Sequence, residues 1–320
     1  SIQGLDISDN GFDDLVAAEV IRELLRQNNT ITRLYMNFNT FGSNVAFLRC
    51  IGEGFRINTN LQELNLSACG LDDQGLSILA ESFGQQNRGL LNLNLSANQI
   101  TCSGLRALVN HATAALSTVT HLNLTNNYVL DEGASFLAET LRLQTLPSLK
   151  CLGLHHCGIS DDGLVALMLA LEENESLEVL DIERNTFSAR GYLALASSLP
   201  NIKRLRQIDF SLSTIDPSVM PALLEGFGKN TSLHEANIER CEQGTDWSQQ
   251  VSFFLYRNKF RHLLQDADTD DRASLGLWSR ALGSVATRPD VLFHVLTSKA
   301  GLIRATPGEG SNKRKRDDSE

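Results

Sequence analysis

Apolar and polar residues alternate in short stretches, which longer amphipathic segments separate. Residues 90–100, LLNLNLSANQI, are one such stretch: leucine alternates with asparagine, the alternation breaks at Asn98, and an isoleucine follows. Strict alternation predicts a strand, because successive side chains of a strand point to opposite faces. The segments between the stretches, such as residues 76–83 and 164–171, carry apolar residues three and four positions apart. That period predicts a helix with one apolar stripe.

The same pattern of strand and helix recurs along most of the chain. Its copies begin at positions 2, 31, 61, 90, 119, 149, 177, 205 and 233, and the last copy is degraded. The interval is 28 to 30 residues throughout. Neither the apolar face of the strand nor the apolar stripe of the helix can be buried within one copy. A fixed period of this length therefore predicts repeats that stack into one continuous core.

The spacing LxxLxLxxN/CxL resembles the leucine-rich repeat family, and the repeat length resembles its ribonuclease-inhibitor-like class. The resemblance covers residues 1–245. It implies an α/β fold, a leucine-rich-repeat solenoid shaped as a horseshoe, with a parallel sheet on the concave face and helices on the convex face. It also implies that Asn98 points inward and hydrogen-bonds the turning backbone. Cys69 and Cys157 occupy the same slot.

Three parts are predicted along the chain. Residues 1–245 form about nine repeats of 28 to 30 residues, after which the period stops. Residues 246–300 contain amphipathic helical segments, which we expect to form an α-helical cap over the last repeat. Residues 301–320 end in a polar, charged stretch and are expected to form a disordered tail.

Charge and cysteine usage narrow the class of protein. The net charge of −10 disfavours nucleic-acid binding, which needs an extended basic surface. The six cysteines are scattered, as in reduced intracellular proteins, and no apolar run reaches membrane-spanning length. We expect a cytoplasmic or nuclear protein. A basic run in the tail matches a nuclear import signal and would bind an import receptor. It comprises Lys313, Arg314, Lys315 and Arg316.

Motifs that suggest chemistry fail on inspection. GFGKNTS, residues 226–232, lacks the first glycine and the final Ser or Thr of a phosphate-binding loop. DADTDDRASLGL, residues 266–277, lacks the glycine and the last glutamate of a calcium loop. His155, His156 and Cys157 are adjacent, but the cysteine points inward and the three do not converge. We therefore expect no catalytic residues, no metal and no cofactor.

The solvent-facing strand positions are the candidate site. Neighbouring strands lie about 4.8 Å apart, so nine of them form a long, rigid surface. Its C-terminal copies are rich in acids and arginines, histidines border them, and aromatic residues lie near the other end. Tyr and Arg are favoured anchors at protein interfaces. The residues expected to contact a partner are Tyr35, Phe38, His121, His155, His156, Asp181, Glu183, Arg184, Asp209, Glu239 and Arg240.

The sequence thus predicts a non-enzymatic, intracellular interaction module that binds another protein on its concave face. One alternative is a GTPase-activating regulator, because a family of activators for a nuclear-transport GTPase resembles this chain in repeat length. In that family a long acidic run follows the repeats, whereas helices and KRKR follow here. Another alternative is the ligand-sensing part of a larger NOD-like sensor, because the chain opens inside a repeat at Ser1. The nucleotide-binding domain of such a sensor would precede that residue.

Overall fold

The computed structural model describes residues 2–83, 88–212, 215–238, 247 and 250–259. The chain is divided into two compact units, Ser1–Asn258 and Lys259–Glu320. Almost all of the second unit lies outside the described residues. The predicted tail 301–320, and the part of the predicted cap 246–300 that follows residue 259, therefore stay predictions.

Nine short strands of the described residues pair in chain order into one parallel sheet. Their register sets the middle residues of neighbouring strands opposite each other, as with Leu64 and Leu93, and these leucines are buried. The strands are β1 (Gly4–Asp6), β2 (Arg33–Tyr35), β3 (Glu63–Asn65), β4 (Asn92–Asn94), β5 (His121–Asn123), β6 (Cys151–Gly153), β7 (Val179–Asp181), β8 (Gln207–Asp209) and β9 (Glu235–Asn237).

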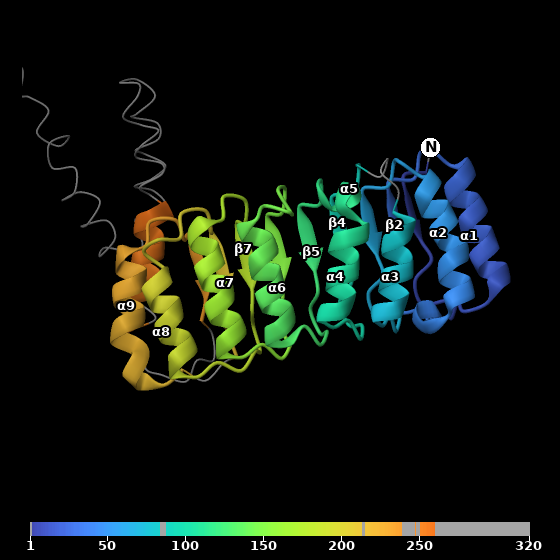
Figure 1. Cartoon of the computed structure of the whole chain (residues 1–320). Coiled ribbons are helices and arrows are strands. Elements are labelled where there is room, and N and C mark those ends of the chain that lie inside the picture. The colour runs from blue at the N-terminus through green and yellow to red at the C-terminus, as the bar shows by residue number, and fades with distance from the viewer. Residues whose placement is uncertain (1, 84–87, 213–214, 239–246, 248–249, 260–320) are drawn as a thin grey trace, which may run out of the picture. The chain divides into compact units, whose positions relative to one another are not determined.

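Helices connect the strands and lie along one side of the sheet (Figure 1). The α-helices are α1 (Leu15–Gln27), α2 (Val45–Ile57), α3 (Asp73–Ser82), α4 (Cys102–His111), α5 (Thr113–Leu116), α6 (Leu130–Arg142), α7 (Asp161–Glu173), α8 (Ala189–Ser198) and α9 (Met220–Lys229). Two 3-10 turns, η1 (Phe41–Ser43) and η2 (Pro217–Val219), precede α2 and α9. The apolar stripes of the helices and the inner face of the sheet enclose one continuous core. The predicted leucine-rich-repeat solenoid is confirmed.

Asn98 joins two neighbouring repeats from the inside. Its Oδ1 accepts hydrogen bonds from the backbone N–H groups of Cys69 and Leu71, at 3.1 and 2.9 Å. Its Nδ2 donates to the carbonyls of Leu66 and Leu95, both at 2.9 Å. A buried amide needs such partners, and backbone groups at the turn need them equally. The inward, structural role that the family resemblance implies for Asn98 is confirmed.

Cysteine fills the same slot with a weaker donor. The thiol of Cys69 donates to the carbonyl of Met36, and that of Cys157 to the carbonyl of Leu124, both at 3.2 Å. Burial raises the pKa of the Cys69 thiol to about 11 and that of Cys157 to about 12. Both thiols therefore stay protonated and unreactive at neutral pH.

The residue before this slot has a left-handed backbone in repeat after repeat. Phe38, for example, has a φ of 58°, and its N–H donates to the carbonyl of Ser67 at 3.0 Å. The bond keeps neighbouring repeats paired where the chain leaves the sheet, and it offsets a backbone conformation that costs a non-glycine residue about 1–2 kcal/mol. The non-glycine residues at this position are Asp9, Phe38, Ala68, Ala97, Asn126, His156, Arg184 and Leu212.

A glycine near the start of α7 lets one repeat bond directly to the next. Asp131 of α6 accepts hydrogen bonds from the backbone N–H groups of Ser160 and Gly163, at 2.7 and 2.9 Å. A Cβ atom at position 163 would lie 2.7 Å from Asp131 Oδ1 and 2.9 Å from the side chain of Ala134. Burial alone would raise the pKa of Asp131, but the bonds from Ser160 and Gly163 hold it below its usual value.

The compact unit extends past the repeat boundary expected at residue 245. Residues 247 and 250–259 are helical, with Trp247, Val251 and Leu255 in the core. Arg257 donates to the carbonyls of Gly228 and Asn230, both at 2.8 Å. This segment follows β9 as α9 follows β8, so its position is that of the ninth repeat's own helix. That explains why the unit ends at Asn258.

Candidate partner-binding face

Two residues of every strand face solvent. In β2, Leu34 is fully buried. Arg33 before it is exposed, and Tyr35 after it is half-buried. The strands therefore present two columns of side chains on the face opposite the helices, which we call the concave face. Most of the strand residues predicted as contacts lie in the column that contains Tyr35, and only His121 lies in the column that contains Arg33. The strict alternation within each strand was the signal that could have found it.

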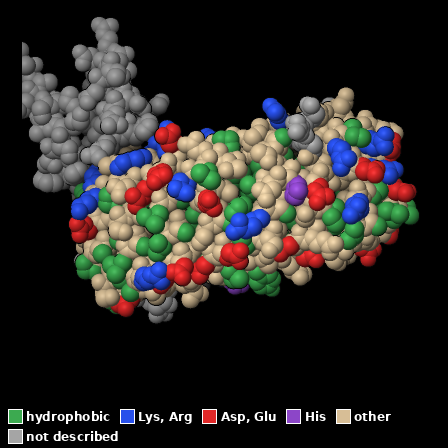
Figure 2. Space-filling model, viewed as in Figure 1, with side chains coloured by type: hydrophobic (Ala, Val, Ile, Leu, Met, Phe, Trp, Pro, Cys, Tyr) green, Lys and Arg blue, Asp and Glu red, His purple; other side chains and the backbone are tan. Residues whose placement is uncertain are grey.

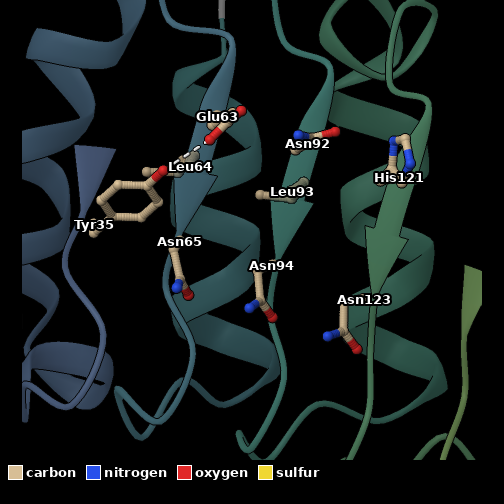
Figure 3. A pocket seen from close by; sticks show the side chains of 9 residues that line it. All are labelled: Tyr35, Glu63, Leu64, Asn65, Asn92, Leu93, Asn94, His121 and Asn123. Carbon is tan, nitrogen blue, oxygen red and sulfur yellow. Dashed lines mark hydrogen bonds between the residues drawn. The ribbon is translucent and has the colours of Figure 1, made fainter. Parts of the chain in front are cut away.

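The N-terminal half of the concave face contains a shallow pocket of about 180 Å³ over β2 to β5. Figure 3 shows Tyr35 leaning toward Glu63 on one side of this pocket, while Asn92 and His121 project from the neighbouring strands on the other. The Tyr35 hydroxyl donates to Glu63 Oε2 at 2.8 Å. That hydrogen bond is the main reason why the pKa of Tyr35 is raised. The bond fixes an aromatic ring at the edge of the pocket.

Three of the residues that line the pocket are asparagines that form a row across neighbouring strands. The Oδ1 atoms of Asn65, Asn94 and Asn123 each accept a hydrogen bond from the backbone N–H two residues ahead, at 3.0 Å in every case. Because a backbone N–H can only donate, each amide must turn its oxygen inward to it. The three amides lie parallel in Figure 3, with their nitrogens on the same side. The row thus presents aligned N–H donors to the concave face.

The C-terminal half of the concave face is acidic. Nδ1 of His155 lies 3.2 Å from Glu183 Oε2, and Asp181 Oδ1 accepts a hydrogen bond from the backbone N–H of Glu183 at 3.0 Å. Burial is the main cause that raises the pKa of Asp181, and the negative charge of Asp209 adds to it. The side chain of Asp209 is itself held in place by two hydrogen bonds. It accepts one from Ser211 Oγ at 2.8 Å and one from Asn237 Nδ2, on the neighbouring strand β9, at 2.9 Å.

Three further predicted contacts lie on the left-handed turns. Phe38, His156 and Arg184 occupy the same position in their repeats, and all three are exposed. His156 Nδ1 lies 2.8 Å from Asn126 Oδ1, whereas Arg184 Nε lies 3.9 Å from Glu183 Oε1. The chain thus displays these side chains at the edge where it leaves the sheet.

The predicted residues therefore fall into separate groups. Tyr35 lines the pocket with His121, Phe38 stands at the turn after β2, and His155 joins Asp181 and Glu183. Cys157 points into the core, so it does not converge with the two histidines before it. Six further contact or import residues lie outside the described part of the chain. They are the contacts Glu239 and Arg240 and the basic run Lys313, Arg314, Lys315 and Arg316. All six stay predictions.

Two features beyond the concave face bear on other expectations. Lys229, in the sequence that imitates a phosphate loop, ends α9 and binds Glu225 at 2.6 Å, while the next residue, Asn230, is fully buried. The opposite, helix-bearing side mixes acidic and basic side chains with scattered apolar ones (Figure 2). Among the described helices, none has the length and apolar character needed to cross a membrane.

Comparisons with known proteins agree with this architecture. A profile described as "Leucine Rich repeat" matches residues 58–80, 115–138 and 145–168. Human NACHT, LRR and PYD domains-containing protein 5 is 30% identical over 62% of this chain and 18% of that protein. Ribonuclease inhibitor of Sus scrofa is 28% identical over 62% of this chain and 43% of its own. Capping protein, Arp2/3 and myosin-I linker protein 2 of Mus musculus is 33% identical over 57% of this chain and 15% of its own.

Among solved structures, Leiomodin-1 Actin-Binding Site 2 matches 53% of this chain and 95% of its own, with a TM-score of 0.45 and 18% identity. This chain spans about a fifth of the NACHT, LRR and PYD relative and less than half of ribonuclease inhibitor.

The repeats, their sheet and these relatives together place the chain among the leucine-rich repeat proteins of the ribonuclease-inhibitor-like class. Within that class it is a protein-interaction module. Proteins of this family are in general non-enzymatic binding modules, and that this chain is no enzyme stays a prediction.

Proposed function

We propose that this chain binds a partner protein along its concave face, inside the cell. The observation that carries the proposal is that polar side chains on this face are already held in place. Asn94 is fixed by the backbone, Tyr35 by Glu63, and Asp209 by Ser211 and Asn237. A surface whose side chains are ordered before binding loses little conformational entropy when a partner docks.

The two halves of the face suggest two kinds of anchor. Phe38 is 62% exposed at the turn after β2, in the same repeat as Tyr35. Aromatic side chains of this kind supply large contact areas at protein interfaces. Glu183 and Arg184 supply charge at the other end. A partner that spans β2 to β8 would meet an aromatic anchor and a charged anchor on one rigid sheet.

Capture experiments with the full chain test the proposal. The tagged chain and three folded variants would be used as bait in extracts of the native cell, with captured proteins quantified by mass spectrometry. Phe38→Asn removes the aromatic anchor and Glu183→Arg reverses the charged one. Glu139→Arg is the matched control, because Glu139 is an exposed residue of α6 on the helix side.

We expect one set of proteins to be captured by the wild type and by Glu139→Arg, and to be reduced at least about tenfold by either concave-face variant. Equal capture by all four baits would refute binding through this face. Loss with Glu139→Arg alone would place the interface on the helices instead.

A second function, the sensing part of a larger NOD-like sensor, is supported by the similarity to a protein that the name describes as containing NACHT and PYD domains. Sequencing the complete transcript decides it. A nucleotide-binding domain encoded in the same transcript would support this function, and a transcript without one would reject it. The GTPase-activating alternative stays a prediction for a GTP-hydrolysis assay.

A further inference from the structure

We propose that His155, Asp181 and Glu183 form a binding site for a divalent transition-metal cation such as Zn²⁺. Each residue offers one ligand atom, and these atoms all lie within 4.8 Å of one another. An imidazole nitrogen with carboxylate oxygens is a donor set that suits zinc. Three protein ligands would leave one position for water, as in zinc sites that stay open to solvent.

The register of two neighbouring strands brings these donors together. Gly153 of β6 pairs with Asp181 of β7, so two residues farther along, His155 comes to lie beside Glu183. The alternation of a strand then turns Asp181, Glu183 and His155 to the same face. Nδ1 of His155 already points at a carboxylate oxygen, 3.2 Å from Glu183 Oε2. The histidine therefore presents a ring nitrogen to the acids instead of to bulk solvent.

The backbone beneath the cluster is fixed. The N–H of Leu154 donates to the carbonyl of Asp181 at 2.7 Å, and the N–H of His156 donates to the carbonyl of Glu183 at 2.9 Å. Asp181 Oδ1 is held by the N–H of Glu183, which leaves Oδ2 for a ligand. Closing around a cation would thus require side-chain rotation but no change in the sheet.

Charge in this part of the face favours a cation. Asp181, Glu183 and Asp209 stand on adjacent strands or just after them, and all three are only half-exposed. One positive group, that of Arg184, lies close to the acids, with its Nε 3.9 Å from Glu183 Oε1. Asp209 already accepts bonds from Ser211 and Asn237, so it would lie outside the ligand set and contribute its field.

The competing explanation is that His155 and Glu183 form an ion pair and nothing more. A metal-binding measurement separates the two. The full chain, purified without a histidine tag and stripped with a chelator, would be titrated with Co²⁺ and followed by visible absorption. The absorption of bound Co²⁺ reports the ligands and their geometry. Added Zn²⁺ should then displace it.

Four variants locate the site. We expect His155→Ala and Glu183→Gln to weaken Co²⁺ binding at least about tenfold, because each removes one ligand. The matched control is His156→Ala, which removes the neighbouring histidine, whose ring faces Asn126 instead. Cys151→Ser tests the half-buried thiol of β6 as a rival ligand. Thermal unfolding of each apo variant checks the fold.

Binding of one Co²⁺ per chain, kept in His156→Ala and Cys151→Ser and weakened in the other two, is the expected result. Absence of Co²⁺ and Zn²⁺ binding by the wild type would leave only the ion pair and overturn the proposal. Equal binding by His155→Ala, or loss with Cys151→Ser, would also overturn it. The result does not depend on any partner protein, so it stands or falls separately from the proposed function.

Discussion

Asn94 and Asn98 lie four residues apart on the same repeat, yet they face opposite sides of the sheet. Asn98 is 6% exposed and bonds backbone groups of two repeats, whereas Asn94 accepts one bond from Ser96 and faces the concave side. The same comparison holds along the chain, because equivalent residues repeat both environments. A single repeat therefore separates two roles: its buried side chains hold neighbouring repeats together, and its solvent-facing side chains are left to contact a partner.

The largest expected change in stability comes from replacing Asn98 by alanine, and Asn94→Ala is its matched control. Asn98→Ala leaves the N–H groups of Cys69 and Leu71 without their acceptor, and we expect a loss of about 3 kcal/mol in the free energy of unfolding. Asn94→Ala should cost less than about 1 kcal/mol, because water can replace its single bond. Urea unfolding followed by circular dichroism measures both. Equal losses would contradict the division of work.

A smaller effect is expected where helices of neighbouring repeats meet. Gly163→Ala places a Cβ atom 2.7 Å from Asp131 Oδ1, so either the aspartate or the backbone must move. We expect a loss of about 1–3 kcal/mol in the free energy of unfolding. Gly70→Ala is the control for steric crowding. A Cβ atom at position 70 would meet no neighbouring atom, so this variant reports only the cost of alanine at a left-handed φ of 71°. A stable Gly163→Ala protein would show that this junction adapts.

The charge of Asp131 adds a dependence on pH. Its pKa is lowered in the folded protein, so the ionised carboxylate stabilises the fold above the unfolded pKa of about 3.9. That contribution is lost as the pH falls through the folded pKa. Asp131→Asn should therefore be less stable than wild type at neutral pH and equal to it in strong acid. Urea midpoints at both pH values test this, and a difference that persists in acid would point to lost packing instead.

The smallest change in stability is expected at Phe38. Asparagine tolerates a left-handed backbone better than phenylalanine, so Phe38→Asn should raise the free energy of unfolding by about 0.5 kcal/mol or leave it unchanged. Ala97→Asn, at the same position of another repeat, is the matched control for the backbone effect. The two should change stability alike, and only Phe38→Asn should reduce partner capture.

Much of this architecture follows from the sequence, because a strand with period two and a helix with period 3.6 leave strong traces. The strands, the helices and the inward Asn98 were all predicted. The left-handed turns were not, since residues as different as Phe38, Ala97 and Arg184 occupy them without a glycine signal. The backbone bond to the next repeat determines that conformation, and no local pattern encodes it.

The candidate site was predictable as a face but not as a set of contacts. His155 and Glu183 are far apart in sequence, and only the register of β6 against β7 brings them within 3.2 Å. Glu63 and Asn92 were overlooked because they lie in the second column of the concave face. Helical residues 247 and 250–259 were assigned to a cap because the ninth copy of the repeat is degraded, which hid their place in that repeat.

Site-specific photo-crosslinking in the native cell tests directly whether the concave face is the binding surface. A photoreactive residue would replace Asn94 on β4 in one chain and Leu169 in another. Leu169 is the control, because it is 58% exposed on α7 at the helix side. We predict a discrete crosslinked protein from position 94 and none from position 169. Crosslinks from position 169 alone would contradict it.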